Sequence, residues 1–178
     1  MSRRRALMSN NADSFPMYLY NDGVISHVVQ DFTTDGYKYG ESFAQSKGSS
    51  YLRIYSTSQY NIRGGRTYTT QLPIPISCIG KTLHVTGTQV NSAASDLRNS
   101  KAYVFISESV ITTSNTENVI SSGSFVNNIQ TSQDLLGAST TINIHLTLSI
   151  TQAGYISIVG YKGYSGNLNM NINKIWIE

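Results

Sequence analysis

Residues 141–150 decide the fold class, and they read Thr-Ile-Asn-Ile-His-Leu-Thr-Leu-Ser-Ile. Every second residue from Ile142 to Ile150 is apolar, and the residues between them are polar. Because successive side chains of a strand point to opposite faces of a sheet, this alternation predicts a strand with one buried and one solvated face. That pattern is typical of antiparallel sheets packed on a core.

The same kind of alternation recurs along the rest of the chain. Strands are predicted over residues 24–30, 51–56, 67–74, 81–90, 102–110, 154–161 and 168–178, with shorter ones near 37–43 and 118–126. Turns rich in Gly, Asn and Ser separate them, and short helices are expected at most near residues 93–99 or 132–136. Many short strands of this kind indicate a sandwich or barrel. We predict an all-β, jelly-roll-type antiparallel β-sandwich.

The last predicted strand contains a break in its alternation. Leu168, Met170 and Ile172 keep one parity, whereas Ile175 and Ile177 keep the other. A β-bulge adds one residue to a strand and would return all five side chains to one face. We therefore predict a bulge near residues 173–174, which turns Trp176 to the opposite face of the sheet.

The positive charge of the chain is confined to its first residues. The net charge is +3, and Arg3, Arg4 and Arg5 are three of the 13 basic residues, so the remaining ten balance the ten acidic ones. A neutral body offers no broad field for nucleic acid, which usually requires many neutralised phosphates. We divide the chain into a basic N-terminal arm, residues 1–23, and a sandwich domain, residues 24–178.

Cysteine content and hydropathy set further limits. Cys78 is the only cysteine, so no disulfide forms within the chain, and we expect the thiol to be buried as a small hydrophobe. No apolar segment follows the arginines, so no secretory signal is expected at this end. The chain has no run of about 18 apolar residues, and we expect no membrane partner.

Residues suited to catalysis or metal binding are scattered along the chain. His27, His84 and His145 each lie alone in a strand pattern, whereas a metal site needs converging ligands. Asp31 and Asp35 flank one polar stretch and could supply oxygens to a cation, although the segment has few carboxylates and turn capping explains them better. No Gly-x-Ser-x-Gly motif occurs. We predict a non-enzyme with no catalytic residues, no cofactor and no metal site.

Aromatic and arginine side chains supply the predicted contact residues. The chain has 12 tyrosines and one tryptophan, and exposed aromatic rings offer amphipathic contact area to sugars or protein partners. Strand propensity alone also accounts for many tyrosines. The Arg-Gly-Gly-Arg segment at residues 63–66 could grip an anion or form a hairpin turn between residues 51–56 and 67–74. The predicted glycan or partner contacts are Tyr60, Arg63, Tyr161, Tyr164 and Trp176.

Two segments carry a resemblance to known proteins. The opening Met-Ser-Arg-Arg-Arg-Ala-Leu-Met is similar to the start of virion proteins of crAss-like tailed phages that infect gut Bacteroidales. Residues 154–158, Gly-Tyr-Ile-Ser-Ile, and residues 173–178, Asn-Lys-Ile-Trp-Ile-Glu, resemble jelly rolls of the carbohydrate-binding-module type found in phage fibres and decoration proteins. The resemblance implies a structural virion component, made in the host cytoplasm and often oligomeric, commonly a trimer.

Two functions follow as predictions. In the first, the chain is a head fibre, decoration or tail-associated protein that docks to other virion proteins through Arg3, Arg4, Arg5 and Phe15. The alternative is a lectin-like module that binds host surface glycans. Three arginines are too few for genome packaging, so nucleic acid is not expected as a partner.

Overall fold

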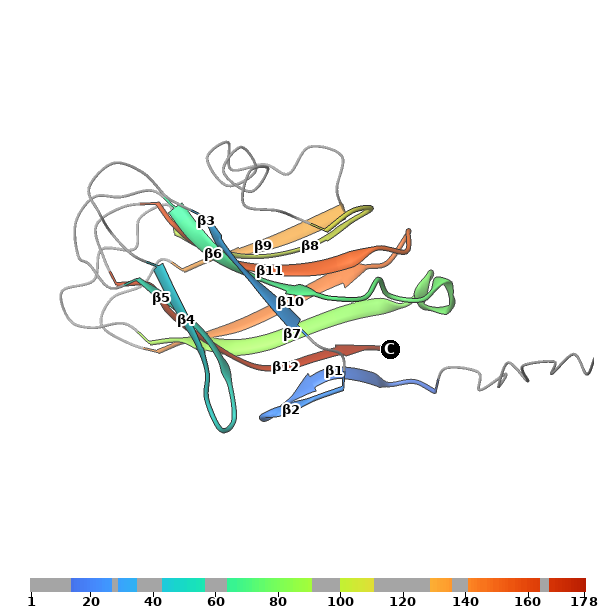
Figure 1. The fold of residues 1–178 in the computed structure, drawn as a ribbon, viewed down its shortest axis with the longest axis horizontal. Coiled ribbons are helices and arrows are strands. Elements are labelled where there is room, and N and C mark those ends of the chain that lie inside the picture. Colours follow the sequence, from blue (N-terminus) through green and yellow to red (C-terminus); the bar gives the residue numbers. More distant parts are fainter. Residues whose placement is uncertain are drawn as a thin grey trace, which may run out of the picture.

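The structure is a computed structural model that describes residues 14–26, 29–34, 43–56, 64–90, 100–110, 129–135, 141–163 and 167–178. Its strands form two antiparallel sheets packed face to face (Figure 1). The fold is an all-β sandwich of the jelly-roll type, as predicted. Within these ranges, no helical segment has the length and hydropathy of a membrane span.

The larger sheet has seven strands in the order β10-β7-β12-β1-β2, and β5 pairs with both β12 and β4. Its strands are β1 (Met17–Asn21), β2 (Val24–Ile25), β4 (Phe43–Lys47), β5 (Leu52–Ser56), β7 (Thr82–Gln89), β10 (Ile142–Ser149) and β12 (Asn169–Ile177). In β10, Ile144, Leu146 and Leu148 are buried, whereas Asn143, His145, Thr147 and Ser149 are exposed. The alternation that predicted a one-sided strand is confirmed.

The smaller sheet has five strands in the order β3-β6-β11-β8-β9. They are β3 (Val29–Thr34), β6 (Gly64–Thr70), β8 (Lys101–Ser107), β9 (Ile129–Asp134) and β11 (Tyr155–Lys162). The predicted hairpin between residues 51–56 and 67–74 is wrong, because β5 and β6 belong to different sheets. A helical turn near residues 132–136 is also wrong, since residues 132–134 pair with β8 as part of β9. The predictions at residues 93–99 and 118–126 lie outside the described residues.

The core fills the space between the two sheets. Leu83 and Ile172 face it from the seven-stranded sheet, and Val104 and Ile158 face it from the five-stranded sheet. Burial of such apolar area is the main favourable contribution to folding. The sheets approach closely at Gly160 of β11, where a Cβ would lie 2.9 Å from three core side chains.

The predicted boundary of the arm at residue 23 is too late in the chain. β1 pairs with β12 along Met17 to Asn21, and Leu19 and Tyr20 are fully buried in the core. Phe15, which was assigned to partner docking, packs against this core and lies under Lys81, whose Nζ is 4.6 Å from the ring centroid. The sandwich therefore includes β1 and the residues just before it.

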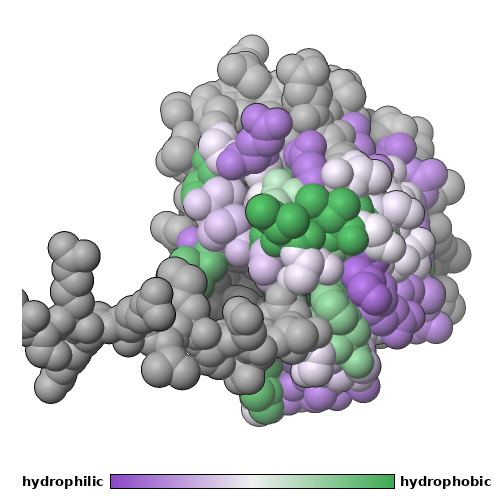
Figure 2. Space-filling model, turned by 90° about the vertical axis from the view of Figure 1, so that its right-hand side faces the viewer, coloured by the Kyte–Doolittle hydropathy of each residue, from purple (hydrophilic) through white to green (hydrophobic). Residues whose placement is uncertain are grey.

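The segment between β6 and β7 forms one end of the sandwich. It contains a 3-10 turn, η1 (Ile76–Cys78), in which Cys78 is fully buried, as predicted. Leu72, Ile76 and Ile79 of this segment are exposed, and Figure 2 shows an apolar patch surrounded by polar residues at this end.

The amide of Gln133 joins the edges of the two sheets. Its Nε2 donates to the Asn143 carbonyl at 2.7 Å, and its Oε1 accepts from the His145 N–H at 2.9 Å. The side chain comes from β9, and the two backbone groups lie on β10 of the other sheet. An edge strand exposes unpaired backbone groups that invite pairing with other chains. Gln133 satisfies two of these groups as a neighbouring strand would.

Replacing Gln133→Ala should loosen β10 without unfolding the sandwich. The loss of two partly exposed hydrogen bonds is expected to lower the free energy of unfolding by about 1 kcal/mol. Amide hydrogen exchange should show faster exchange at the His145 N–H than in the wild type. Gln130→Ala, at an exposed position of the same strand, is the control. Unchanged exchange at His145 would contradict the assigned role of Gln133.

Candidate functional site

A row of aromatic rings crosses the outer face of the seven-stranded sheet. Its members are Tyr18 of β1, Trp176 of β12, His84 of β7 and His145 of β10, and we call them the aromatic strip. Trp176 lies directly opposite His84 on one side and opposite Tyr18 on the other. Neighbouring residues such as Leu83 and Ile177 point into the core, so the alternation of each strand turns the four rings outward.

The rings of the strip contact one another in sequence. The centroids of His84 and Trp176 are 4.7 Å apart, with planes only 9° from parallel. This separation is close to the strand spacing of about 4.8 Å, so the two rings stand side by side with their edges toward solvent. His145 lies 6.0 Å from His84, and Tyr18 lies 6.4 Å from Trp176. Tyr18 is 41% exposed, which makes it an accessible end of the strip.

One carboxylate meets the strip at its centre. Glu178 Oε1 lies 3.1 Å from His84 Nε2, and the backbone of Glu178 is held against Thr82 by two hydrogen bonds. The other ring nitrogen of His84, Nδ1, is buried and has no hydrogen-bond partner among the described residues. The imidazole is therefore oriented by Glu178 on one side and by the Trp176 ring on its face.

The predicted β-bulge is present and places Trp176 in the strip. The register of β12 against β7 shifts between Ile172 and Lys174, so Asn173 is the extra residue. Ile175 and Ile177 are consequently buried, while Trp176 faces outward and is half-buried.

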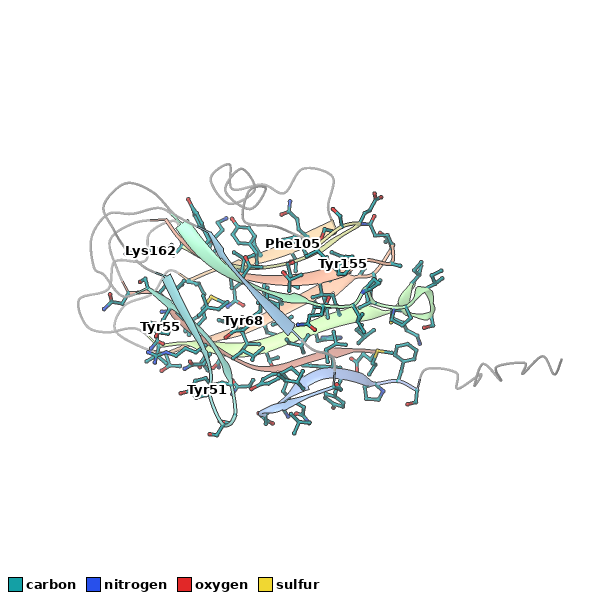
Figure 3. All side chains as sticks on the ribbon, in the orientation of Figure 1. Tyr51, Tyr55, Tyr68, Phe105, Tyr155 and Lys162 are labelled. Atoms are coloured by element: carbon teal, nitrogen blue, oxygen red, sulfur yellow. The ribbon has the colours of Figure 1, made fainter. Side chains whose placement is uncertain are left out.

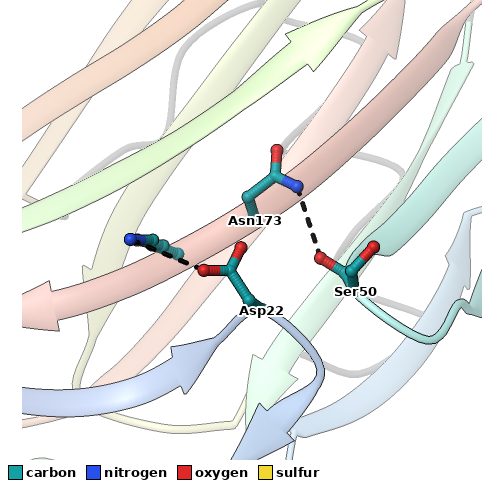
Figure 4. A network of polar contacts seen from close by, with 4 residues as sticks. Asp22, Ser50 and Asn173 are labelled. Carbon is teal, nitrogen blue, oxygen red and sulfur yellow. Dashed lines mark hydrogen bonds and ion pairs between the residues drawn. The ribbon is translucent and has the colours of Figure 1, made fainter.

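Polar contacts around Asn173 hold the bulge in place (Figure 4). The Asn173 carbonyl accepts from the backbone N–H of Asp22 at 2.9 Å, and its Nδ2 donates to the Ser50 carbonyl at 3.3 Å. Lys174 Nζ lies 3.5 Å from the Asp22 carboxylate. The β1–β2 turn and the β4–β5 loop are thus both fastened to the extra residue.

A second group of side chains lies on the same outer face, at the other end of β12. The Arg53 guanidinium lies over the Tyr55 ring, with Cζ 4.4 Å from its centroid, and Arg53 Nε donates to Asn169 Oδ1 at 2.8 Å. Arg53 is directly opposite Asn171, whose Oδ1 is buried without a partner among the described residues. Figure 3 shows Tyr55 on β5. We call Arg53, Tyr55, Asn169 and Asn171 the arginine cluster.

The outer face of the five-stranded sheet carries aromatic residues of a different kind. Tyr103, Phe105, Val159 and Tyr161 form a buried cluster there, and the rings of Tyr103 and Tyr161 meet edge to face with centroids 6.4 Å apart. Burial raises the pKa of the Tyr103 phenol above its ordinary value, and Tyr161 and Asp134 add to this effect. Tyr161, predicted as a glycan or partner contact, is only 9% exposed, so it is poorly placed for that role.

The remaining predicted site residues are distributed as follows. Of the predicted contacts, the structure places Trp176 in the aromatic strip, whereas Arg3, Arg4, Arg5, Tyr60, Arg63 and Tyr164 lie outside the described residues. The side chain of Asp31 and the whole of Asp35 also lie outside them, so a cation at this pair stays untested. The described residues contain no group of three His, Cys, Asp or Glu side chains suited to a metal ion.

Sequence reasoning missed Tyr18, His84, His145 and Arg53 as site residues. His84 and His145 were interpreted as isolated because their strands are distant in sequence, and the sheet order brings them together. Their signal was their parity: each occupies a polar position in an alternating strand. The parity of a residue in its strand indicates that its side chain points outward, but it does not indicate which residue of the next strand lies beside it.

The comparisons with known proteins show likeness at the level of fold. No protein-family profile and no curated protein sequence matches the chain. A carbohydrate-binding module from a study of promiscuous specificity in the β-sandwich superfamily is similar, with a TM-score of 0.53 and 14% identity. The match covers 92% of this chain and 62% of that one, so this chain spans less than two thirds of the length of that protein. A family 29 carbohydrate-binding module has a TM-score of 0.47 and 7% identity, covering 93% and 92% of the two chains. A family 11 module from Clostridium thermocellum, in complex with a mixed-linked tetrasaccharide, has a TM-score of 0.43 and 10% identity, covering 88% and 90%.

Substituting Gly87→Ala should disturb the strip through the bulge. A Cβ at Gly87 of β7 would lie 2.2 Å from the Asn171 carbonyl oxygen, so β12 must shift near its bulge. Such overpacking is expected to lower the free energy of unfolding by about 2 kcal/mol. Urea denaturation measures the loss, and the fluorescence maximum of Trp176, the only tryptophan, should shift in the folded variant.

Thr88→Ala, one residue along the same strand and directed outward, is the control for this substitution. It should change the free energy of unfolding by no more than about 0.5 kcal/mol. If Gly87→Ala matched the wild type in both stability and emission, the close approach of β7 and β12 would not constrain the bulge.

Proposed function

We propose that this chain is a non-enzymatic glycan-binding module that uses the outer face of its seven-stranded sheet. The observation that carries the proposal is the aromatic strip, four rings in contact across four strands on an accessible face. The sandwich neighbour with a TM-score of 0.53 is itself a carbohydrate-binding module, which supports the view that this architecture can carry glycan sites. Because fold alone does not fix function, the argument rests on the strip.

The chemistry of the strip suits a sugar. A pyranose ring has apolar C–H groups and a rim of hydroxyls, so its site needs both aromatic carbon and hydrogen-bonding atoms. The upright rings of His84 and Trp176 present aromatic carbon at their edges, and the exposed Glu178 carboxylate beside His84 can accept hydrogen bonds from hydroxyls. Asn143, Thr88 and Asn171 form a cross-strand row on the same face and add amide and hydroxyl groups.

The position of the strip on paired strands also favours binding. The rings are held by the sheet and by one another, so little side-chain freedom is lost when a ligand arrives. The only acidic side chain in contact with the strip is, among the described residues, Glu178. A single carboxylate does not repel a polar, neutral ligand.

A role as a virion component docked through Arg3, Arg4 and Arg5 stays a prediction, because these residues lie outside the described part of the chain. The two roles are compatible, since a fibre or decoration protein can also bind a glycan. Localisation to a virion and assembly into a trimer likewise stay predictions from the sequence resemblance.

Trp176→Ala should weaken glycan binding at least about tenfold, because a central aromatic contact commonly contributes more than about 1.4 kcal/mol. A glycan array identifies a ligand, and calorimetry measures its affinity for the wild type and the variant. In the wild type, the ligand should also change the fluorescence of Trp176, which reports contact with the strip directly.

Tyr155→Ala serves as the matched control, because Tyr155 is a half-buried aromatic residue on the five-stranded sheet (Figure 3). Its affinity should stay within about twofold of the wild type. The proposal fails if folded wild-type protein binds no glycan above background. It also fails if Trp176→Ala binds the identified glycan as tightly as the wild type does.

A further inference from the structure

We propose that the arginine cluster is a subsite for the carboxylate of a uronic acid, so that the preferred ligand is an acidic glycan. This inference rests on the proposed function and adds the ligand class. Arg53, Tyr55, Asn169 and Asn171 share the outer face with the aromatic strip, and only Nε of the guanidinium has a hydrogen-bond partner among them.

The charge of Arg53 is not balanced within the described residues. On this face Glu178 contacts His84 and Asp22 pairs with Lys174, and no carboxylate in the described part of the chain pairs with Arg53. A guanidinium carries five N–H donors. Nε donates to Asn169, and no described residue accepts from the two Nη atoms, so their four N–H groups can bind a ligand.

The guanidinium is also held in a fixed position. Tyr55 supports one of its faces, with Cζ 4.4 Å from the ring centroid, and Asn169 holds its Nε edge. Tyr68 of the opposite sheet donates its hydroxyl to the Arg53 carbonyl at 3.4 Å, which fixes the backbone from below. A planar fork held in this way matches a planar carboxylate through two parallel hydrogen bonds.

Hydroxyl recognition is available beside the fork. Asn171 lies opposite Arg53, and its Oδ1 is buried without a partner among the described residues, so a rotation of the amide toward the surface would let it accept a hydrogen bond from a sugar hydroxyl. A buried acceptor that lacks a partner is costly, and a ligand would remove that cost. A uronic acid needs a group that binds its carboxylate beside a group that accepts from its hydroxyl, and Arg53 and Asn171 supply these two groups.

The cluster and the strip can contact one chain of sugars. His84 pairs with Trp176, and Thr88, four residues further along β7, pairs with Asn171. Four residues of a strand span about 13 Å, so the two groups lie on one face within reach of an oligosaccharide. A glycan that contacts the strip with one residue can therefore place the carboxylate of another on Arg53.

The test compares acidic polysaccharides with their own neutral derivatives. Polygalacturonate, alginate and glucuronoxylan are each measured beside their carboxyl-reduced forms, in which uronic acids become neutral sugars with the same linkages. At least one acidic form should bind about tenfold more tightly than its reduced form, the usual scale of a charge-assisted contact. A sulfated neutral polysaccharide tests whether any anion suffices, and binding equal to the best uronate would overturn the carboxylate assignment.

Arg53→Gln should abolish the preference for the acidic form, so that the acidic and reduced forms bind this variant with affinities within about twofold of each other. Arg53→Lys should restore only part of it, because an ammonium lacks the fork. Lys101→Gln removes a positive charge from the five-stranded sheet and should keep the full preference. Urea denaturation confirms that each variant is folded.

The outcomes separate this inference from the proposed function. If neutral glycans bind, Trp176→Ala weakens them and no acidic form is preferred, the inference is overturned while the module remains glycan-binding. Retention of the preference in Arg53→Gln overturns it in the same way. If folded protein binds neither acidic nor neutral glycans, both proposals fall together.

Discussion

The bulge at Asn173 is the constraint on which both faces of the larger sheet depend. β12 pairs with β7, β1 and β5, so any change in its phase affects most of that sheet. Without the extra residue, Ile175 and Ile177 would point outward and Trp176 inward. Burying an isoleucine side chain stabilises a fold by roughly 1.5–3 kcal/mol, so the bulged phase is strongly favoured. The polar groups of Asn173 that the shift exposes are bonded to Asp22 and Ser50.

The same constraint links the core to the candidate site. Each strand of the larger sheet is fixed in phase by its buried residues, such as Leu83 in β7 and Leu146 in β10. Once these phases are fixed, the residues of opposite parity must face outward, and the antiparallel register decides which of them are neighbours. His84, Trp176 and Tyr18 meet for this reason, and His145 lies diagonally across from His84. The aromatic strip is therefore a consequence of core packing as much as of surface composition.

The parts of this structure that depend on local alternation could be predicted from the sequence. β10, β7 and the bulge in β12 follow from the spacing of apolar residues, and the outward direction of Trp176 follows from the bulge. β9 could not be found in this way, because its polar sequence owes its strand geometry to pairing with β8. The partition of β5 and β6 into different sheets depends on long-range pairing, which no local pattern encodes.

Exposure was harder to predict than direction. In β11 both faces are buried, so the parity that places Tyr161 away from the core does not place it in solvent. β12 and β1 differ, since outward residues such as Trp176 and Tyr18 keep part of their surface exposed to solvent. A tyrosine on an alternating strand is therefore an ambiguous signal until the opposite face is known to be open. This is why Trp176 is accessible on its face of the sandwich and Tyr161 is not.

The arrangement of the rings constrains the kind of ligand that the face can hold. His84 and Trp176 stack on each other, so the faces between them are covered and these two rings offer a ligand only their edges. The rings of Tyr18 and His145 are available at the two ends of the strip. The edge of one ring covers only part of a sugar, so useful affinity requires several such contacts along the sheet. The cross-strand row of Asn143, Thr88 and Asn171 supplies further amide and hydroxyl contacts on the same face. A flat face built in this way matches an extended ligand better than a compact one, and it is rigid because every side chain stands on a paired strand.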